Sequence, residues 1–276
     1  MLKRRIPEST QATVTRWLPP VVLAALKRAL GSVHYGGDYP GWPQAMADCE
    51  GFDAREILER VTRAALAVKN GEAAYERDSV TFDKKAYVWH VLASLLRTAA
   101  RNGGELGVLD FGGSLGSSYF QHRVWFEGLK RFQWTIVEQP SFVEVGRRHF
   151  EDEALRFFAD LPSALAHGRP NVLLVSAVLQ YLEDPYARLA ELTNAGFDAL
   201  IFDRVGFTLD GRDRLTVQRV GERIYPASYP CWFFDHARFL AAFGDRYRLV
   251  NTFEPVDRAN IPARYEAFFF ERVTAR

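Results

Sequence analysis

The stretch that most constrains this chain is residues 107–116, GVLDFGGSLG, where an apolar run ends at an acid and breaks into glycines. Such a run followed by a glycine-rich turn is typical of the first β-strand of a nucleotide-binding α/β domain. Glycine permits positive φ and close approach of the backbone to a ligand, and the next helix offers unpaired N–H groups. We therefore expect ligand binding at this turn.

The same turn is also partly consistent with other kinds of functional site. The dinucleotide fingerprint G-x-G-x-x-G is incomplete, because Phe111 stands at its first glycine. Residues 112–116 also fit G-x-S-x-G, which would make Ser114 the nucleophile of a hydrolase, with Asp203 and His236 following in the order of a triad. Such an elbow follows several strands, however, and the residues before it read as helix or loop. The serine hydrolase and a non-catalytic binding or scaffold domain remain the alternatives.

Charge and cysteine content limit the possible partners and compartment. The 35 Lys and Arg residues nearly balance 34 Asp and Glu residues, so no strong field favours nucleic acid as a partner. Cys49 and Cys231 are the two cysteines and form neither a C-x-x-C pair nor a disulfide framework. We therefore expect a cytoplasmic protein.

Membrane and metal signals are weak in this sequence. No apolar run approaches the roughly 20 residues that span a bilayer, so no integral membrane segment is expected. An amphipathic helix over 18–26 is expected to pack on the domain, with peripheral membrane attachment as the minor alternative. The six histidines form no H-x-x-x-H pair, and no metal site is predicted. The sequence does not indicate an oligomeric state.

The order of predicted elements indicates an α/β fold. Residues 1–105 read as a helical cap, interrupted at 34–43 by an ordered loop or lid rich in Gly, Pro and aromatic residues. One helix of this cap is expected to follow Asp83. From 106 onward strands alternate with helices, which predicts a mostly parallel sheet with helices on both faces. The strands after the organising one are expected at 133–138, 155–159, 171–177, 199–203, 246–253 and 267–273.

The glycine turn resembles the first motif of the Rossmann-like class I S-adenosylmethionine-dependent methyltransferases, with Ser114 at the usual middle glycine. Further blocks, in order, are similar to one group of bacterial methyltransferases associated with surface-polysaccharide gene sets: DFGGSLGSSYF, VEQPSFVEVG, SAVLQYLEDP, FDRVGF, DRLTVQRV and YPASYPCWFF. The resemblance implies a seven-stranded class I methyltransferase domain over 106–276. It also implies S-adenosylmethionine as cofactor and S-adenosylhomocysteine as product.

The cofactor is expected at the carboxyl ends of the strands, where doubly wound sheets bind ligands. Glu138 could accept hydrogen bonds from both ribose hydroxyls. Asp160 and Leu161 would face the adenine, although Asp160 could equally cap a helix. The resemblance assigns these residues to the cofactor: Asp110, Phe111, Gly112, Gly113, Ser114, Gly116, Glu138, Gln139, Asp160, Leu161, Ser176 and Gln180.

Methyl transfer is an in-line displacement, so positioning matters most, and a hydroxyl acceptor needs a base. Asp203, followed by Arg204, is the first candidate, although the pair could be a structural salt bridge. The further candidates are Tyr181, His122 and His236. O-methylation is therefore the expected reaction.

The segment 204–234 interrupts the alternation of strand and helix and is expected to be a substrate-facing insertion. Its aromatic residues could stack on a sugar or an aromatic acceptor, and its arginines could hold a phosphate or carboxylate. Alternatively, the aromatics cover a sheet edge and the arginines are solvated. These residues are Tyr229, Trp232, Phe233, Arg214 and Arg219. The expected acceptor is a small molecule or a glycan.

Overall fold

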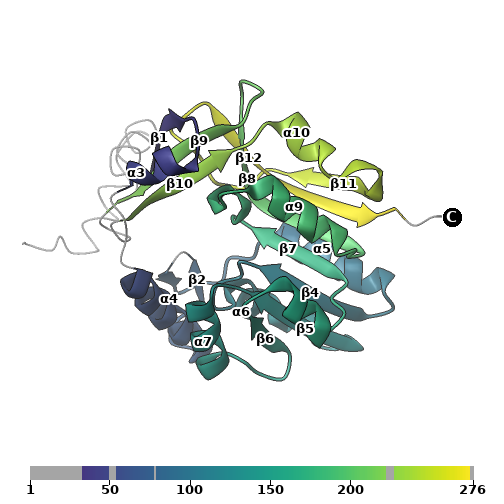
Figure 1. The fold of residues 1–276 in the computed structure, drawn as a ribbon. Helices are drawn as coiled ribbons and strands as arrows, with labels where there is room; N and C mark the ends of the chain where they lie inside the picture. The colour runs from purple at the N-terminus through teal and green to yellow at the C-terminus, as the bar shows by residue number, and fades with distance from the viewer. Residues whose placement is uncertain (1–32, 50–53, 78, 222–226, 274–276) are drawn as a thin grey trace, which may run out of the picture.

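A seven-stranded sheet forms the centre of the computed structural model, which describes residues 33–49, 54–77, 79–221 and 227–273. The helix predicted at 18–26 lies outside these residues. The strand order is β11-β12-β8-β7-β4-β5-β6 (Figure 1), and the strands are β4 (Glu105–Phe111), β5 (Arg131–Val137), β6 (Leu155–Phe158), β7 (Val172–Ser176), β8 (Ala199–Thr208), β11 (Tyr247–Phe253) and β12 (Ala263–Arg272).

The pairing directions confirm the predicted Rossmann-like fold. The five strands from β6 to β8 run parallel, and β12 runs antiparallel to both of its neighbours. Every predicted strand of this sheet is present. The strand expected at 199–203 extends to Thr208, because β12 pairs with it beyond a register shift near Val205.

Helices cover both faces of the sheet. Side chains alternate along each strand, so Val172 and Leu174 enter one core while Leu173 and Val175 enter the other. Helices α4 (Ala54–Lys69), α5 (Trp89–Arg101), α6 (Ser117–His122) and α7 (Pro140–His149) pack into the first core. The second core receives α8 (Leu161–His167), α9 (Pro185–Asn194) and α10 (His236–Ala241).

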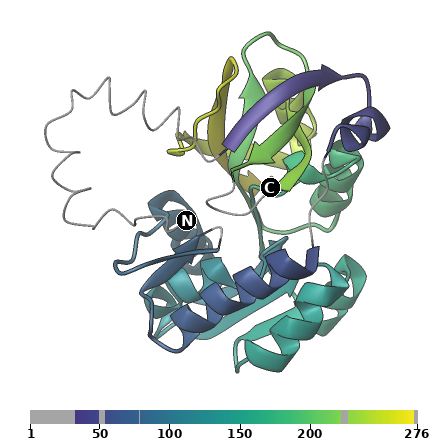
Figure 2. The ribbon, with the colours of Figure 1, turned by 90° about the vertical axis from the view of Figure 1, so that its left-hand side faces the viewer.

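A second, small sheet joins two distant parts of the chain. Its antiparallel strands are ordered β1-β9-β10, namely β1 (Val33–Tyr39), β9 (Arg214–Val220) and β10 (Ala227–Phe233). Figures 1 and 2 both show it on the opposite side of the molecule from α4 and β6. Segment 34–43, predicted as a loop, is thus mostly strand, followed by α3 (Trp42–Ala47). Its pairing partner lies far away in sequence, which local composition cannot indicate.

The N-terminal third differs from the predicted helical cap in two further ways. A hairpin of β2 (Tyr75–Arg77) and β3 (Val80–Phe82) follows α4. The helix expected after Asp83 begins only at Trp89. A domain boundary near residue 105 stays a prediction. None of the helices described is both long and apolar enough to cross a membrane.

Candidate functional site

The glycine turn after β4 has a geometry that only glycine fits at two positions. Gly112 has φ of 72°, and a Cβ there would lie 2.5 Å from a Val178 methyl carbon. A Cβ on Gly113 would lie 2.5 Å from the Asp110 carboxyl carbon. Gly116, with φ of 95°, is the N-cap of α6. The turn therefore keeps its backbone open at the carboxyl end of the sheet.

Backbone strain gathers around this turn. Among the described non-glycine residues, Ser114, Ala177 and Arg204 have φ of 53°, 54° and 59°. They lie just after β4, just after β7 and within β8, and these three strands are neighbours in the sheet. A fourth, Ser79, has φ of 68° between β2 and β3. Left-handed conformations of such residues are costly and concentrate at ligand sites. The clustering indicates a functional edge.

Two cavities meet at this edge. The first, here called the His90 cavity, measures about 550 Å³ and lies among the β2–β3 hairpin, the start of α5, the glycine turn and segment 254–257. The second, the Glu138 cavity, measures about 560 Å³ and lies among the ends of β4 and β5, the start of α8 and the turn after β7. Both are lined by Gly112 and Ala177. A ligand laid across the glycine turn would therefore reach into both.

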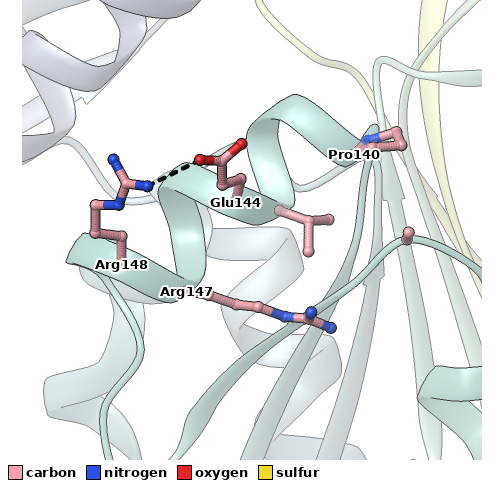
Figure 3. A pocket seen from close by; sticks show the side chains of 6 residues that line it. Pro140, Glu144, Arg147 and Arg148 are labelled. Carbon is pink, nitrogen blue, oxygen red and sulfur yellow. Dashed lines mark hydrogen bonds and ion pairs between the residues drawn. The ribbon is translucent and has the colours of Figure 1, made fainter.

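A shallower pocket of about 490 Å³ continues the Glu138 cavity along α7 (Figure 3). Pro140 and Ala159 line both. Arg147 donates a hydrogen bond of 3.0 Å to the carbonyl oxygen of Phe157, and Glu144 pairs with Arg148 at 2.9 Å. Because these polar side chains already have partners within the protein, they leave this pocket mainly a contact surface for a ligand.

Asp110 and Glu138, two of the carboxyl groups predicted to bind the cofactor, have different surroundings. Asp110 is 2% exposed and accepts a hydrogen bond of 3.1 Å from the indole of Trp134. Burial raises the pKa of Asp110 to about 7. Burial also raises the pKa of Glu138, although the backbone N–H of Gln139 donates to its carboxylate at 2.6 Å. A carboxyl group thus lines each cavity.

Asp160 caps α8, as its alternative interpretation expected. Its carboxylate accepts from the N–H of Ser163 at 2.7 Å and from the Ser163 hydroxyl at 3.0 Å, and these bonds lower the pKa of Asp160. The residue still lines the Glu138 cavity. The predicted cofactor residues Phe111, Gln139 and Leu161 line the same cavity.

Other predicted cofactor residues lie on the opposite side of the turn or behind it. Gly113, Ser114 and Ser176 line the His90 cavity. Gln180 is buried and donates to the carbonyl oxygen of Arg204 at 3.2 Å. Gln180 and Gly116 therefore support the two cavities and line neither.

Asp203 is at the His90 cavity but faces another side chain. It is 2% exposed, and its two oxygens contact His90 Nε2 at 2.7 Å and Ser176 Oγ at 2.8 Å. Burial opposes ionisation of Asp203, but the hydrogen bonds from His90 and Ser176 outweigh it and lower its pKa. His90 was not predicted. The two residues are 113 positions apart, and no sequence spacing links them.

The His90 cavity is acidic. Five carboxyl groups line its described walls, against two arginines, Arg77 and Arg204. Both arginines contact the same oxygen of Asp257, at 2.9 and 3.1 Å. Arg204 therefore pairs with Asp257 and Asp203 with His90, so the expected salt bridge between Asp203 and Arg204 is replaced by these two contacts. The other four carboxyl groups belong to Glu76, Asp110, Asp203 and Glu254.

The remaining predicted bases are not arranged for proton transfer. Tyr181 lines the Glu138 cavity, but its hydroxyl donates to Gln218 at 2.9 Å and burial raises its pKa well above the ordinary value. His122 is buried, its Nδ1 lies 2.9 Å from the carbonyl oxygen of Ser118, and burial lowers its pKa to about 4. His236 pairs with Glu266 at 3.2 Å. Neither histidine lines either cavity.

The hydrolase triad is not assembled among the described residues. Ser114 lies in the glycine turn, but His236 pairs with Glu266 and Asp203 pairs with His90. A serine nucleophile needs its base within hydrogen-bond reach.

The predicted substrate residues lie in the small sheet, and none of them lines either cavity. Phe233 is 0% exposed, and the Trp232 indole donates to the carbonyl oxygen of Leu182 at 3.1 Å. Tyr229 accepts from Gln218 at 3.0 Å. Arg214 donates to the carbonyl oxygen of Gly37, and Arg219 pairs with Asp48 at 2.7 Å. These side chains therefore contact other parts of the protein, and a role for them in substrate binding stays a prediction.

No family model and no curated protein matches this sequence. Three similar solved structures share low sequence identity with this chain. The N-terminal domain of EvdMO1 with S-adenosylhomocysteine and D-fucose is 14% identical, with a TM-score of 0.46, and the match covers 81% of this chain and 98% of that domain. Magnesium protoporphyrin IX methyltransferase from Synechocystis PCC 6803 is 16% identical, with a TM-score of 0.45 and coverage of 81% and 99%. An S-adenosylmethionine-dependent methyltransferase from Clostridium acetobutylicum ATCC 824 is 9% identical, with a TM-score of 0.45 and coverage of 68% and 93%. Because these similarities are low, the functional assignment depends on the geometry of this chain.

Proposed function

We propose that this chain is an S-adenosylmethionine-dependent methyltransferase that acts on a small-molecule or glycan acceptor. The observation that carries the proposal is the meeting of the two cavities at Gly112 and Ala177, where the parallel strands β4 and β7 end. Doubly wound sheets bind their ligands at this place. One cavity would hold the adenosine part of the cofactor and the other the acceptor.

The residues present fit this cofactor. Gly112 and Gly113 leave a cradle that a Cβ would fill, and Glu138 at the end of β5 could accept hydrogen bonds from the ribose hydroxyls. Residues 159–162 would border the adenine, beside α7 and its open pocket. When bound, S-adenosylmethionine supplies an activated methyl group, which an acceptor in the His90 cavity would receive.

The charge of the His90 cavity favours an acceptor without negative charge. Its two arginines share Asp257, and four further carboxyl groups line its walls. A phosphate or carboxylate there would meet repulsion. The proposal therefore differs from the expectation that arginines of segment 204–234 hold an anionic acceptor. A role in surface-polysaccharide synthesis and a cytoplasmic location stay predictions.

Calorimetry with purified protein tests the proposal. We expect micromolar binding of S-adenosylmethionine and S-adenosylhomocysteine, about −8 kcal/mol, and no comparable binding of NAD. Glu138→Ala should weaken binding about tenfold or more by removing the ribose contact. Glu144→Ala, which removes a 71% exposed acid from neighbouring α7, is the matched control and should change affinity by less than about twofold.

The outcomes separate the three functions. Absence of binding by either adenosyl ligand would overturn the cofactor assignment and leave the hydrolase or the scaffold. Equal binding by wild type and Glu138→Ala would remove Glu138 from the site. Ser114→Ala should retain adenosyl binding, whereas a hydrolase would lose turnover.

A further inference from the structure

His90, at the start of α5, lines the His90 cavity beside Asp203 of β8. Asp203 is 2% exposed and lies behind the imidazole, which is held to it at 2.7 Å. The His90 side chain is 19% exposed and lines the cavity. A molecule in this cavity would therefore meet the imidazole before the carboxylate.

Three contacts fix the orientation of the ring. His90 is the second residue of α5, so its backbone belongs to a helix packed on the first core. Its ring stacks on Phe253 of β11, with 5.1 Å between centroids and 23° between planes. Ser176 Oγ donates to the other oxygen of Asp203 at 2.8 Å and so fixes the carboxylate that holds the ring. This arrangement limits rotation of the imidazole.

The same contacts determine which ring nitrogen carries the proton. An ionised Asp203 can only accept, so the Nε2 that faces it must donate. In neutral His90 the lone pair is then on Nδ1. No hydrogen bond to Nδ1 comes from the described part of the chain, and this nitrogen is not fully buried. It is therefore free to accept from a bound molecule.

We propose that Nδ1 of His90 accepts the proton of an acceptor hydroxyl in this cavity, and that Asp203 and Ser176 are positioning residues. The proposal rests on the proposed methyl transfer. As the O–C bond forms, the S–C bond breaks with its electron pair going to sulfur, and the hydroxyl proton passes to Nδ1 and then to solvent. Asp203 stabilises the imidazolium formed in this step.

Two other histidines of the chain show what distinguishes His90. His122 has its Nδ1 at a backbone carbonyl and is buried away from the cavities. His236 also pairs with a carboxylate, Glu266, but lines neither cavity. The His236–Glu266 pair therefore provides a matched control, with the same groups outside the site.

Nuclear magnetic resonance of the ¹⁵N-labelled full chain at pH 8 tests the inference without an acceptor. Two-bond ¹H–¹⁵N spectra report which imidazole nitrogen is protonated, and His90→Gln assigns the His90 signals. We expect neutral His90 protonated on Nε2. Asp203→Asn should abolish this single tautomer, whereas Glu266→Gln should leave His90 unchanged and alter His236.

Addition of S-adenosylhomocysteine provides a second readout. Its binding should shift the His90 ring signals together with the backbone amides of 112–114, because both border the same cavity. Protonation of His90 on Nδ1, or amide shifts without any change at His90, would overturn the inference. If neither group of signals moves and calorimetry also detects no binding, the proposed function fails, and the inference fails with it.

Activity gives the third readout. With a hydroxyl acceptor, His90→Gln should lower kcat about 10²–10⁴-fold at an unchanged dissociation constant for S-adenosylhomocysteine. His236→Gln should leave kcat unchanged. Wild-type kcat in His90→Gln would overturn the role of His90.

Discussion

The carboxyl edge of the central sheet and the small β1-β9-β10 sheet use similar side chains in opposite ways. In the small sheet, Arg212 pairs with Asp38, Arg219 pairs with Asp48, and Phe233 is wholly buried. At the central edge, carboxyl groups outnumber arginines around a cavity, and an imidazole nitrogen is left without a partner from the described chain. Residue types alone thus do not mark a site. A functional site is marked by an open cavity together with polar atoms that have no partner in the protein.

Backbone conformation gives the same contrast. Gly112 at the central edge and Gly211 in the β8–β9 turn have nearly equal φ, 72° and 71°. A Cβ on Gly112 would collide with Val178, whereas one on Gly211 would meet nothing within 4 Å. Replacing each of the two glycines with alanine therefore distinguishes the free-energy cost of backbone strain from the cost of filling the site.

The largest effect should come from Gly112→Ala. Both Gly112→Ala and Gly211→Ala should lose about 1–2 kcal/mol of unfolding free energy through left-handed strain, and Gly112→Ala should lose more because its Cβ would collide with Val178. Only Gly112→Ala should also lose affinity for S-adenosylhomocysteine, on the order of 100-fold, because the collision moves the turn. Urea unfolding and calorimetry measure the two quantities. Equal affinities in the two variants would mean that the glycine turn does not hold the ligand.

A second effect should appear in the pH dependence of stability. Burial raises the pKa of Asp110 from its ordinary value of 3.8 to about 7, while the Trp134 indole partly opposes this. Between these values the folded chain keeps a proton that the unfolded chain releases. Stability therefore falls as pH rises through this window, by up to about 1.4 kcal/mol per pH unit from this group.

Asp110→Asn tests this effect because it removes the titration and keeps the shape. Urea unfolding at pH 5 and pH 7 should give a flatter profile for the variant than for wild type. Parallel profiles would show that Asp110 is already ionised in the folded chain.

The smallest effect should come from Arg219→Ala in the small sheet. The pair with Asp48 is half exposed, so its loss should lower the unfolding midpoint by less than Gly211→Ala does. Affinity for S-adenosylhomocysteine should stay within about twofold of wild type, since the residue lines neither cavity. A larger loss of affinity would extend the site into the small sheet and weaken the contrast between the two regions.

The same contrast explains what the sequence could predict. The parallel strands carry apolar runs between turn signals, most clearly at residues 172–175, so their own residues indicate them. Asp110 and Glu138 lie at the end of β4 and just beyond β5, as expected, whereas Asp203 lies within β8, which continues to Thr208. The contact of His90 with Asp203 joins positions 113 apart. No periodicity encodes such a pair. The arginines of 204–234 are predicted as ligand groups because their partners, Gly37 on β1 and Asp48 just after α3, are equally remote in sequence.

Pairing of β1 with β9 also bears on the order in which the chain folds. Gly37 accepts a hydrogen bond from Arg214, 177 positions later. During synthesis β1 must therefore wait until most of the chain has left the ribosome, whereas β4, β5 and β6 can pair with near neighbours much earlier. The small sheet should therefore close after β4, β5 and β6 have paired, and until then β1 is an unpaired strand on which a chaperone could act.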